Sequence, residues 1–156
     1  MMKTMVIILT AILISFNAIA EECPATPDKI KKAINKHVRK IRAAEYCAAR
    51  SIKIEGENAI AVYTAEGACF SDKTSTAGAC GNHWERYMVG SINGKTIGPI
   101  EVGGKNNFSD SEMKLAGNSV ELIGLSIGPN DPLCCPSIPQ TKKFEFSQDG
   151  FKEIKP

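Results

Sequence analysis

The sequence predicts an α+β protein in which one N-terminal amphipathic helix packs on an antiparallel β-meander of about eight strands. Apolar residues in the segment 27–46 recur with the 3.6-residue period of a helix. After Arg50, short segments alternate between apolar and polar residues and are separated by glycine-containing turns. Cysteines are spread from Cys23 to Cys135, so the fold is expected to be braced by disulfides.

Residues 1–20 have the pattern of a secretory signal peptide. Lys3 supplies the cationic start, residues 5–16 form an apolar run, and Ala18-Ile19-Ala20 has the small residues of a cleavage site. The run is shorter than the roughly 20 residues that a membrane-spanning helix needs. We therefore expect a periplasmic or secreted protein that does not span a membrane, with residues 21–156 as a single disulfide-stabilised α+β domain.

The helix is expected to begin at Thr26-Pro27-Asp28, with threonine as N-cap, proline in the first position and aspartate in the first turn. Its apolar stripe includes His37, and its basic side chains fall on the opposite arc. Residues 28–42 carry seven basic side chains and one acidic side chain, whereas the rest of the exported chain is net acidic. This asymmetry predicts a strongly dipolar molecule and bears on its partners.

The strands are delimited by turn residues. Asn93-Gly94 is the strongest of these signals, because this dipeptide suits a two-residue hairpin turn. Gly117-Asn118 and Asp149-Gly150 mark two further turns. Strands are expected at 51–55, 59–63, 84–92, 96–102, 112–116, 119–127, 142–147 and 151–154.

Two registers follow from the requirement that apolar side chains share one face. A three-residue loop after the first strand would place Ile54 opposite Ile60, and the turn at Gly117-Asn118 would place Leu115 opposite Val120. The run 120–127 is apolar at nearly every position, so we expect it to be a central strand that is covered on both faces. The helix is the natural cover for one of those faces.

Cys69 and Cys80 bracket a polar, glycine-containing loop and are expected to pair with each other. A straight helix over 27–46 would be roughly 30 Å long. The few residues before it reach only about 14–17 Å, so a bond between Cys23 and Cys47 is not expected.

In this scheme Cys23 and Cys47 divide Cys134 and Cys135 between them. A rival scheme pairs the loop cysteines Cys69 and Cys80 with Cys134 and Cys135. Under either scheme the adjacent cysteines are structural, and replacing one of them is expected to compromise folding. A third alternative is a bond between Cys134 and Cys135, which could act as a redox switch.

The run Asn130-Asp131-Pro132-Leu133-Cys134-Cys135-Pro136-Ser137, together with Cys69 and Cys80-Gly81-Asn82, resembles runs in uncharacterised secreted bacterial proteins. This resemblance implies export and a shared disulfide framework, and it carries no activity. In size, compartment and disulfide-braced β-structure the chain is also similar to small periplasmic inhibitors of lysozyme and to immunity proteins against envelope-attacking toxins.

Three surfaces are candidates for function: the loop bracketed by Cys69 and Cys80, the polar cluster 81–86 that holds the only tryptophan, and the basic helix. A loop held on a sheet scaffold is a common place for binding residues. No catalytic residue, metal ion or cofactor is expected, because the sequence has two histidines and no convincing catalytic motif. The candidate partner-binding residues are Asn82, His83, Asp72, Lys73, Lys32, Lys36 and Arg39.

The leading hypothesis is an exported, non-enzymatic protein that binds another macromolecule, in the manner of an inhibitor or immunity protein. A second hypothesis is an envelope-surface protein whose basic helix binds anionic lipid. A third is a redox or hydrolytic enzyme centred on Cys134 and Cys135. Nucleic acid is not expected as a partner, because the export signal argues against it and no aromatic residues interleave with the basic ones.

Overall fold

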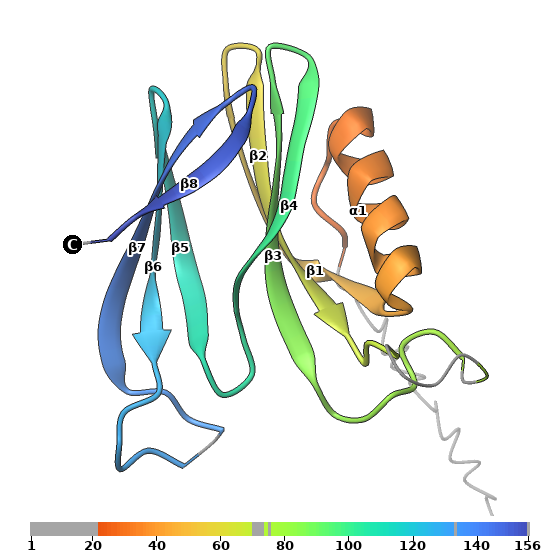
Figure 1. The fold of residues 1–156 in the computed structure, drawn as a ribbon, viewed down its shortest axis with the longest axis vertical. Coiled ribbons are helices and arrows are strands. Elements are labelled where there is room, and N and C mark those ends of the chain that lie inside the picture. The colour runs from red at the N-terminus through yellow and green to blue at the C-terminus, as the bar shows by residue number, and fades with distance from the viewer. Residues whose placement is uncertain (1–21, 70–73, 75, 133, 156) are drawn as a thin grey trace, which may run out of the picture.

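The computed structural model describes residues 22–69, 74, 76–132 and 134–155 (Figure 1). The expected signal peptide, Asp72 and Lys73 lie outside these residues. The described part contains one helix and eight strands, which confirms the predicted α+β class. The elements are α1 (Asp28–Ile41), β1 (Ala44–Glu55), β2 (Asn58–Glu66), β3 (Trp84–Ile92), β4 (Lys95–Gly104), β5 (Phe108–Ala116), β6 (Ser119–Ser126), β7 (Ile138–Ser147) and β8 (Gly150–Ile154).

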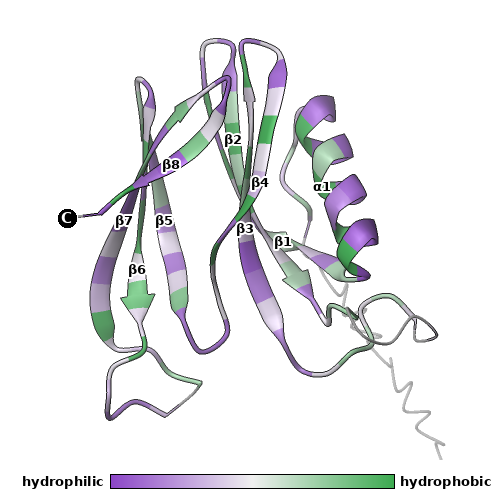
Figure 2. Cartoon of the chain, in the orientation of Figure 1, coloured by the Kyte–Doolittle hydropathy of each residue, from purple (hydrophilic) through white to green (hydrophobic). Residues whose placement is uncertain are grey.

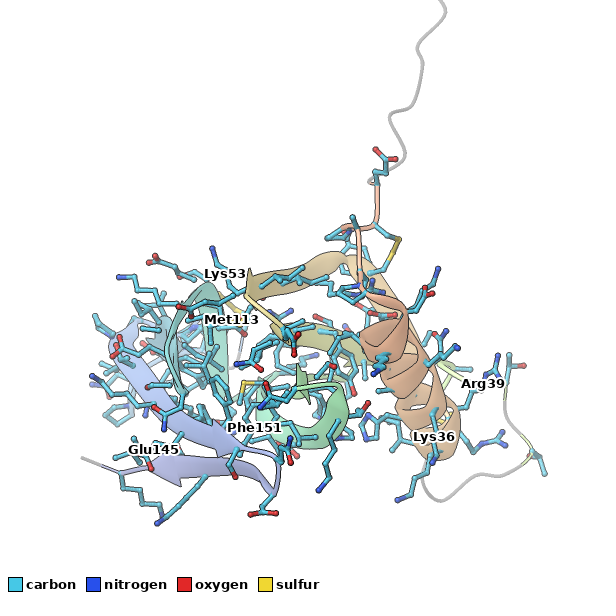
Figure 3. All side chains as sticks on the ribbon, turned by 90° about the horizontal axis from the view of Figure 1, so that it is seen from above. Lys36, Arg39, Lys53, Met113, Glu145 and Phe151 are labelled. Carbon is cyan, nitrogen blue, oxygen red and sulfur yellow. A yellow bond between two sulfur atoms is a disulfide. The ribbon has the colours of Figure 1, made fainter. Side chains whose placement is uncertain are left out.

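The strands form two antiparallel sheets of four, β1-β2-β3-β4 and β5-β6-β7-β8, each a meander in chain order. The two sheets pack face to face, and α1 lies on the outer face of the first sheet, so the molecule has three layers (Figure 1). Met113 and Phe151 lie between the sheets, whereas Lys36 and Glu145 lie on the outer layers (Figure 3). The buried core between the sheets consists of Ile60, Val62, Met88, Ile92, Ile97, Val102, Phe108, Met113, Val120, Leu122, Phe144 and Phe146.

A second core lies between α1 and the first sheet. The apolar stripe of the helix is buried, while its opposite arc is hydrophilic (Figure 2). It packs on strand positions that include several alanines, which leave room for the helix to approach the sheet. The residues of this core are Ile30, Ile34, Val38, Ile41, Ala43, Ala59, Ala61, Tyr63, Ala65, Tyr87 and Val89.

The helix is shorter than expected and ends at Ile41. Arg42 has a left-handed conformation with φ 56°, its N–H bonds to the carbonyl of Arg39, and the N–H of Ala43 bonds to that of Val38. This is a Schellman motif, which usually has glycine at the left-handed position. Because arginine stands there instead, the sequence contains no glycine to signal the end of the helix, and the predicted helix continues to residue 46. In the structure, residues 44–46 belong to the start of β1.

The start of the helix also differs from the prediction. Thr26 does not cap it: its hydroxyl donates to the carbonyl of Pro24 at 2.7 Å, and Pro27 occupies the N-cap position. Fourteen helical residues span only about 21 Å, and β1 then returns alongside. Cys47 therefore lies beside Cys23, with their Cα atoms 5.2 Å apart, and the two form a disulfide. The exclusion of this pair was wrong because it assumed the longer helix.

The pairing of Cys69 with Cys80 is confirmed, with a Cα–Cα distance of 5.0 Å. Since Cys23 bonds to Cys47, the expectation that these two divide Cys134 and Cys135 was wrong. The adjacent cysteines instead bond to each other, with Cα atoms 3.8 Å apart. All six cysteines lie among the described residues, and none is free.

The first hairpin has a two-residue loop, so Ile54 faces Ala59 and Lys53 faces Ile60. The predicted pairing of Ile54 with Ile60 was wrong, because it assumed that β2 is buried on one face only. Since β2 is buried on both faces, its apolar pattern does not fix the register of the hairpin. Ile54 is 62% exposed on the edge strand. The predicted register of the β5–β6 hairpin, with Leu115 opposite Val120, is confirmed.

The strand covered on both faces is β2, together with much of β3, and not the run 120–127 as expected. In β6, Val120 and Leu122 face the other sheet, whereas Leu125 is 41% exposed on the outer face. The helix covers the first sheet, so β6 has nothing over its second face among the described residues.

Candidate functional site

The two ends of the sheet pair differ in their connections. At one end, all four hairpins close with short turns: 56–57, 93–94, 117–118 and 148–149. At the other end, the lower one in Figure 1, lie the longer connections 67–83, 105–107 and 127–137. We call this the loop end. Because binding residues concentrate on loops that a rigid scaffold positions, the loop end is the candidate site.

A buried ion pair joins the two sheets at the loop end. Arg86 of β3 donates from Nε to Oδ1 of Asp110 on β5 at 2.8 Å, and from Nη2 to Oδ2 at 2.7 Å. The third guanidinium nitrogen donates to the carbonyl of Ala49 and to the hydroxyl of Thr64, both at 2.8 Å. The two charged side chains are 8% and 3% exposed. This bidentate geometry fixes β3 against β5 and makes the loop end rigid at this point.

A hollow of about 370 Å³ opens beside this ion pair. It exists because β1 leaves its register with β2 between Tyr46 and Ser51, so four residues of β1 oppose a single residue of β2. Arg50 lies at the end of the displaced segment, and its Nη2 is 2.7 Å from Oε1 of Glu45. The lining residues are Tyr46, Ala49, Ser51, Thr64, Glu66, Trp84, Arg86, Ser109, Asp110 and Ser111.

A second hollow, of about 250 Å³, adjoins the first, and Trp84 and Ser109 line both. One part of its lining is apolar and the other carries amides and an ammonium group. Lys105 donates to the carbonyl of Asn82 at 2.6 Å, which ties the β4–β5 turn to the β2–β3 loop. The lining residues are Asn82, Trp84, Gly104, Lys105, Asn106, Asn107, Ser109, Ile127, Cys134 and Pro136.

The β6–β7 loop, which brings Cys134 to this hollow, is organised by Asp131. Its Oδ2 accepts the N–H groups of Gly128 at 2.7 Å and Ser137 at 2.8 Å, and its Oδ1 accepts the Ser137 hydroxyl at 2.8 Å. Hydrogen bonds from Gly128 and then from Ser137 lower the pKa of the Asp131 carboxyl, because they favour its charged form. The loop is therefore pinned at both ends by one carboxylate.

The β2–β3 loop is fastened to the end of α1. The N–H of Cys69 donates to the carbonyl of Ile41 at 3.2 Å, and that of Gly78 donates to the carbonyl of Arg42 at 2.9 Å. A Cβ on Gly67 would lie 2.1 Å from the carbonyl oxygen of Gly78, so the two limbs of the loop approach too closely for any side chain there. Together with the Cys69–Cys80 bond, these contacts hold the described limbs in place.

The predicted binding residues fall into two separate groups. Asn82 and His83 lie at the loop end, where both line a small hollow of about 150 Å³ with Trp84. His83 is half-exposed, and its Nε2 lies 3.2 Å from Oε1 of Glu85. Lys32, Lys36 and Arg39 are exposed on α1, and Lys36 lines a different hollow between α1 and β4. Asp72 and Lys73 lie outside the described residues.

Sequence reasoning missed the ion pair and the residues of the β4–β5 turn. A signal for the ion pair existed: strand alternation correctly placed Trp84, Arg86 and Met88 on one face, and Met88 is fully buried. An arginine on a buried face needs an acidic partner. Asp110 could not be chosen as that partner, because β5 lies in another sheet.

Chemically, the arrangement supports binding. The Arg86 guanidinium and the Asp110 carboxylate are occupied by each other, and all six cysteines are in disulfides. Among the described residues there is no group of three or more His, Cys, Asp or Glu side chains placed to hold a metal ion. The two hollows that share Trp84 and Ser109 are also lined by a tyrosine, by several amides and hydroxyls, and by the side chains of Glu66 and Lys105.

Comparison with protein-family models, with curated proteins and with solved structures gave no match. Within the part of the chain that the structure describes, no helix is long and apolar enough to cross a bilayer.

Proposed function

We propose that this chain is an exported, non-enzymatic binding protein of the inhibitor or immunity type, and that its loop end engages another macromolecule. The observation that carries the proposal is the position of Trp84, which lines three adjoining hollows at that end. A half-buried aromatic ring in a concave, partly apolar surface is the usual anchor of a binding interface.

The rigidity of the loop end supports the proposal. Its loops are held by the Cys69–Cys80 disulfide, by the Asp131 carboxylate and by the Lys105 contact. Loops that are ordered before binding lose less conformational entropy on docking. Disulfides are also compatible with the oxidising compartment that the N-terminal pattern predicts.

Exposed residues at the two ends offer a matched pair of variants. Asn107→Arg places a long charged side chain on the rim of the second hollow, and Asn118→Arg places the same side chain at the hairpin end. Immobilised protein is incubated with envelope extract, and a panel of purified cell-wall hydrolases is assayed for inhibition. We expect wild type and Asn118→Arg to retain the same partner or inhibit the same hydrolase, and Asn107→Arg to lose that interaction.

Because Trp84 is the only tryptophan, its fluorescence reports directly on this end. Binding of the identified partner should change the emission of wild type and of Asn118→Arg. A partner that binds all three proteins alike, or the lack of any partner and any inhibition, would contradict the proposal.

One observation favours a second candidate function, the binding of an anionic envelope surface by α1. Lys31, Lys32, Lys36 and Arg39 are all exposed on the helix. Co-sedimentation with anionic vesicles tests this candidate. Binding that ignored salt and survived the change of these four residues to Glu would contradict it.

A further inference from the structure

The helix α1 carries six cationic side chains. Among the described residues, no carboxylate lies within 4.0 Å of the ammonium or guanidinium group of any of these side chains. The outer sheet is different, because Lys143 lies 2.6 Å from Glu121, and Lys114 lies 3.8 Å from Glu112. The unpaired cations are Lys29, Lys31, Lys32, Lys36, Arg39 and Lys40.

These cations are distributed around the exposed surface of the helix. At about 100° per residue, Lys29, Lys36 and Lys40 fall on the flank that faces β4, whereas Lys31 and Arg39 fall on other arcs. Lys29 donates from Nζ to the carbonyl of Gly94 at 2.8 Å, so the β4 flank is tied to the β3–β4 turn at one end.

A hollow of about 560 Å³ lies along this flank, between α1 and β4. Ala33, Lys36, His37 and Lys40 form its helical wall, and Thr96, Gly98 and Pro99 contribute the wall from β4. No carboxylate is among the residues that line it. Lys36 is exposed on the outer side of the helix (Figure 3).

His37 is oriented by a hydrogen bond with a buried tyrosine of β2. Its Nδ1 lies 2.7 Å from the hydroxyl oxygen of Tyr63, whose side chain is fully buried. Burial raises the pKa of Tyr63 well above its ordinary value, with Tyr87 and Glu45 adding to the effect, so the phenol stays protonated and donates. Burial, and then the charge of Lys40, lower the pKa of His37, so the ring is neutral at neutral pH. With Nδ1 as the acceptor, the ring proton is on Nε2.

We propose that this hollow binds a phosphate-bearing ligand. Two ammonium groups, from Lys36 and Lys40, supply the charge, and the Nε2–H of His37 supplies a directed donor. A tetrahedral anion offers several acceptor oxygens and can meet donors from three directions, with the strengthening that charge gives a hydrogen bond. The inference is independent of the loop end, and where the phosphate belongs to a lipid headgroup it names one site on the helix for the second candidate function.

Binding and the protonation of His37 are coupled. A bound anion favours the charged imidazolium, so the pKa of His37 rises on binding, and by reciprocity protonation of His37 strengthens binding. The groups that face His37 are Lys36 and Lys40 from α1, Tyr63 from β2, and Tyr87 and Glu85 from β3. The residues of β4 in the hollow carry no titratable side chain.

The experiment uses the two histidines of the exported chain. NMR spectra of the imidazole groups contain signals from His37 and His83 only, and His83 serves as an internal control. Inorganic phosphate is titrated into one sample, and vesicles of phosphatidylglycerol or of phosphatidylcholine into others. We expect a saturable shift of the His37 signals with phosphate groups and no shift of the His83 signals. A pH titration with sulfate, which does not itself titrate in this range, should show a raised His37 pKa.

Two charge-matched double variants test the position of the site. Lys36→Gln with Lys40→Gln removes the charges that line the hollow, and Lys31→Gln with Arg39→Gln removes as many from other arcs. We expect the first pair to weaken phosphate binding about tenfold or more, and the second pair to weaken it by no more than about twofold. All four residues are exposed, so both variants should fold.

The outcomes separate the site from general electrostatics. A His37 shift with free phosphate but not with vesicles identifies a soluble ligand, and a shift only with phosphatidylglycerol identifies a lipid headgroup. Both support the site. Equal weakening by the two double variants, or vesicle binding without a His37 shift, overturns the site and leaves the second candidate function intact. Failure to bind phosphate or either vesicle overturns both.

Discussion

The two sheets of this protein differ in how many of their faces are covered. The sheet β1–β4 has α1 on one face and the other sheet on its second face, and the segment 59–65 of β2 is buried at every position. The sheet β5–β8 is covered on one face only, so Phe144 and Phe146 of β7 are buried while Glu145 between them is exposed.

This difference shows what an apolar run can and cannot indicate. The runs 59–65 and 120–127 are both rich in apolar residues, yet only the first is covered twice. Glu121 is the discriminating residue: its side chain is partly exposed and pairs with Lys143, which is possible only on an open face. A charged residue inside an apolar run therefore carries more information about coverage than the mean hydropathy of the run.

The largest expected effect comes from the ion pair that joins the sheets. Asp110→Ala should lower the free energy of unfolding by about 3–5 kcal/mol, because it leaves the Arg86 guanidinium buried without its carboxylate. The matched change on the open face, Glu121→Ala, removes the partner of a half-exposed lysine and should leave the urea midpoint almost unchanged. Similar midpoints for the two variants would show that Asp110 and Arg86 are hydrated in solution.

The covered and open outer faces can be compared through two aliphatic residues. Ile34 of α1 is 1% exposed, and Ile34→Ala should cost about 2–5 kcal/mol through lost burial and the cavity left behind. Leu125 on the open face of β6 is 41% exposed, and Leu125→Ala should cost less than about 1 kcal/mol. Urea denaturation measures both. A small effect at Ile34 would mean that the helix is not docked on the first sheet.

The long loops of the two sheets carry different kinds of disulfide. Replacing Cys69 and Cys80 together by Ser should cost about 3 kcal/mol, because their bond constrains an intervening segment of the unfolded chain. Replacing Cys134 and Cys135 together should have little effect on thermal stability, because a bond between neighbours closes no such segment.

A large loss of stability in the Cys134 and Cys135 variant would revive the expectation that they are structural. Alkylation under mild reduction, with mass mapping of the peptides, shows in addition whether this bond opens before the other two. Selective opening would support the redox alternative, whereas resistance to reduction would count against it.

The smallest expected effect concerns pH. The Asp131 carboxyl accepts its hydrogen bonds most strongly while it is ionised, and its folded pKa lies below the ordinary 3.8. Its contribution to loop order is therefore present above the pKa of the unfolded chain and is lost as pH falls through the lower folded value. The amide NMR shifts of Gly128 and Ser137 should titrate with a midpoint below 3.8 in wild type, and Asp131→Asn should abolish that titration. A midpoint at or above the ordinary value would contradict the hydrogen bonding described.

Local signals in the sequence predicted most of the elements. Asn93-Gly94 and Gly117-Asn118 correctly marked hairpin turns, and the pairing of Cys69 with Cys80 followed from their nearness in the chain. The predictions failed where a local rule has exceptions, as with the left-handed Arg42, or where the relevant partner is remote, as with Asp110 and Arg86. Asn82 and His83 were chosen as candidate binding residues from the polar cluster that contains them, whereas Lys105 and Ser109 were missed because only folding brings the β4–β5 turn and the start of β5 beside Asn82.

By itself, the sequence determined the α+β class, the amphipathic helix, nearly all the strands and the charge asymmetry, because periodicity, turn residues and side-chain charge are local properties. The tertiary structure decided which sheet the helix covers, how the chain divides into two sheets, which cysteines bond, and where the hollows lie around Trp84 and His37. These features depend on contacts between residues far apart in the chain. Many arrangements satisfy the same local preferences, and only the packing of complete layers selects one of them.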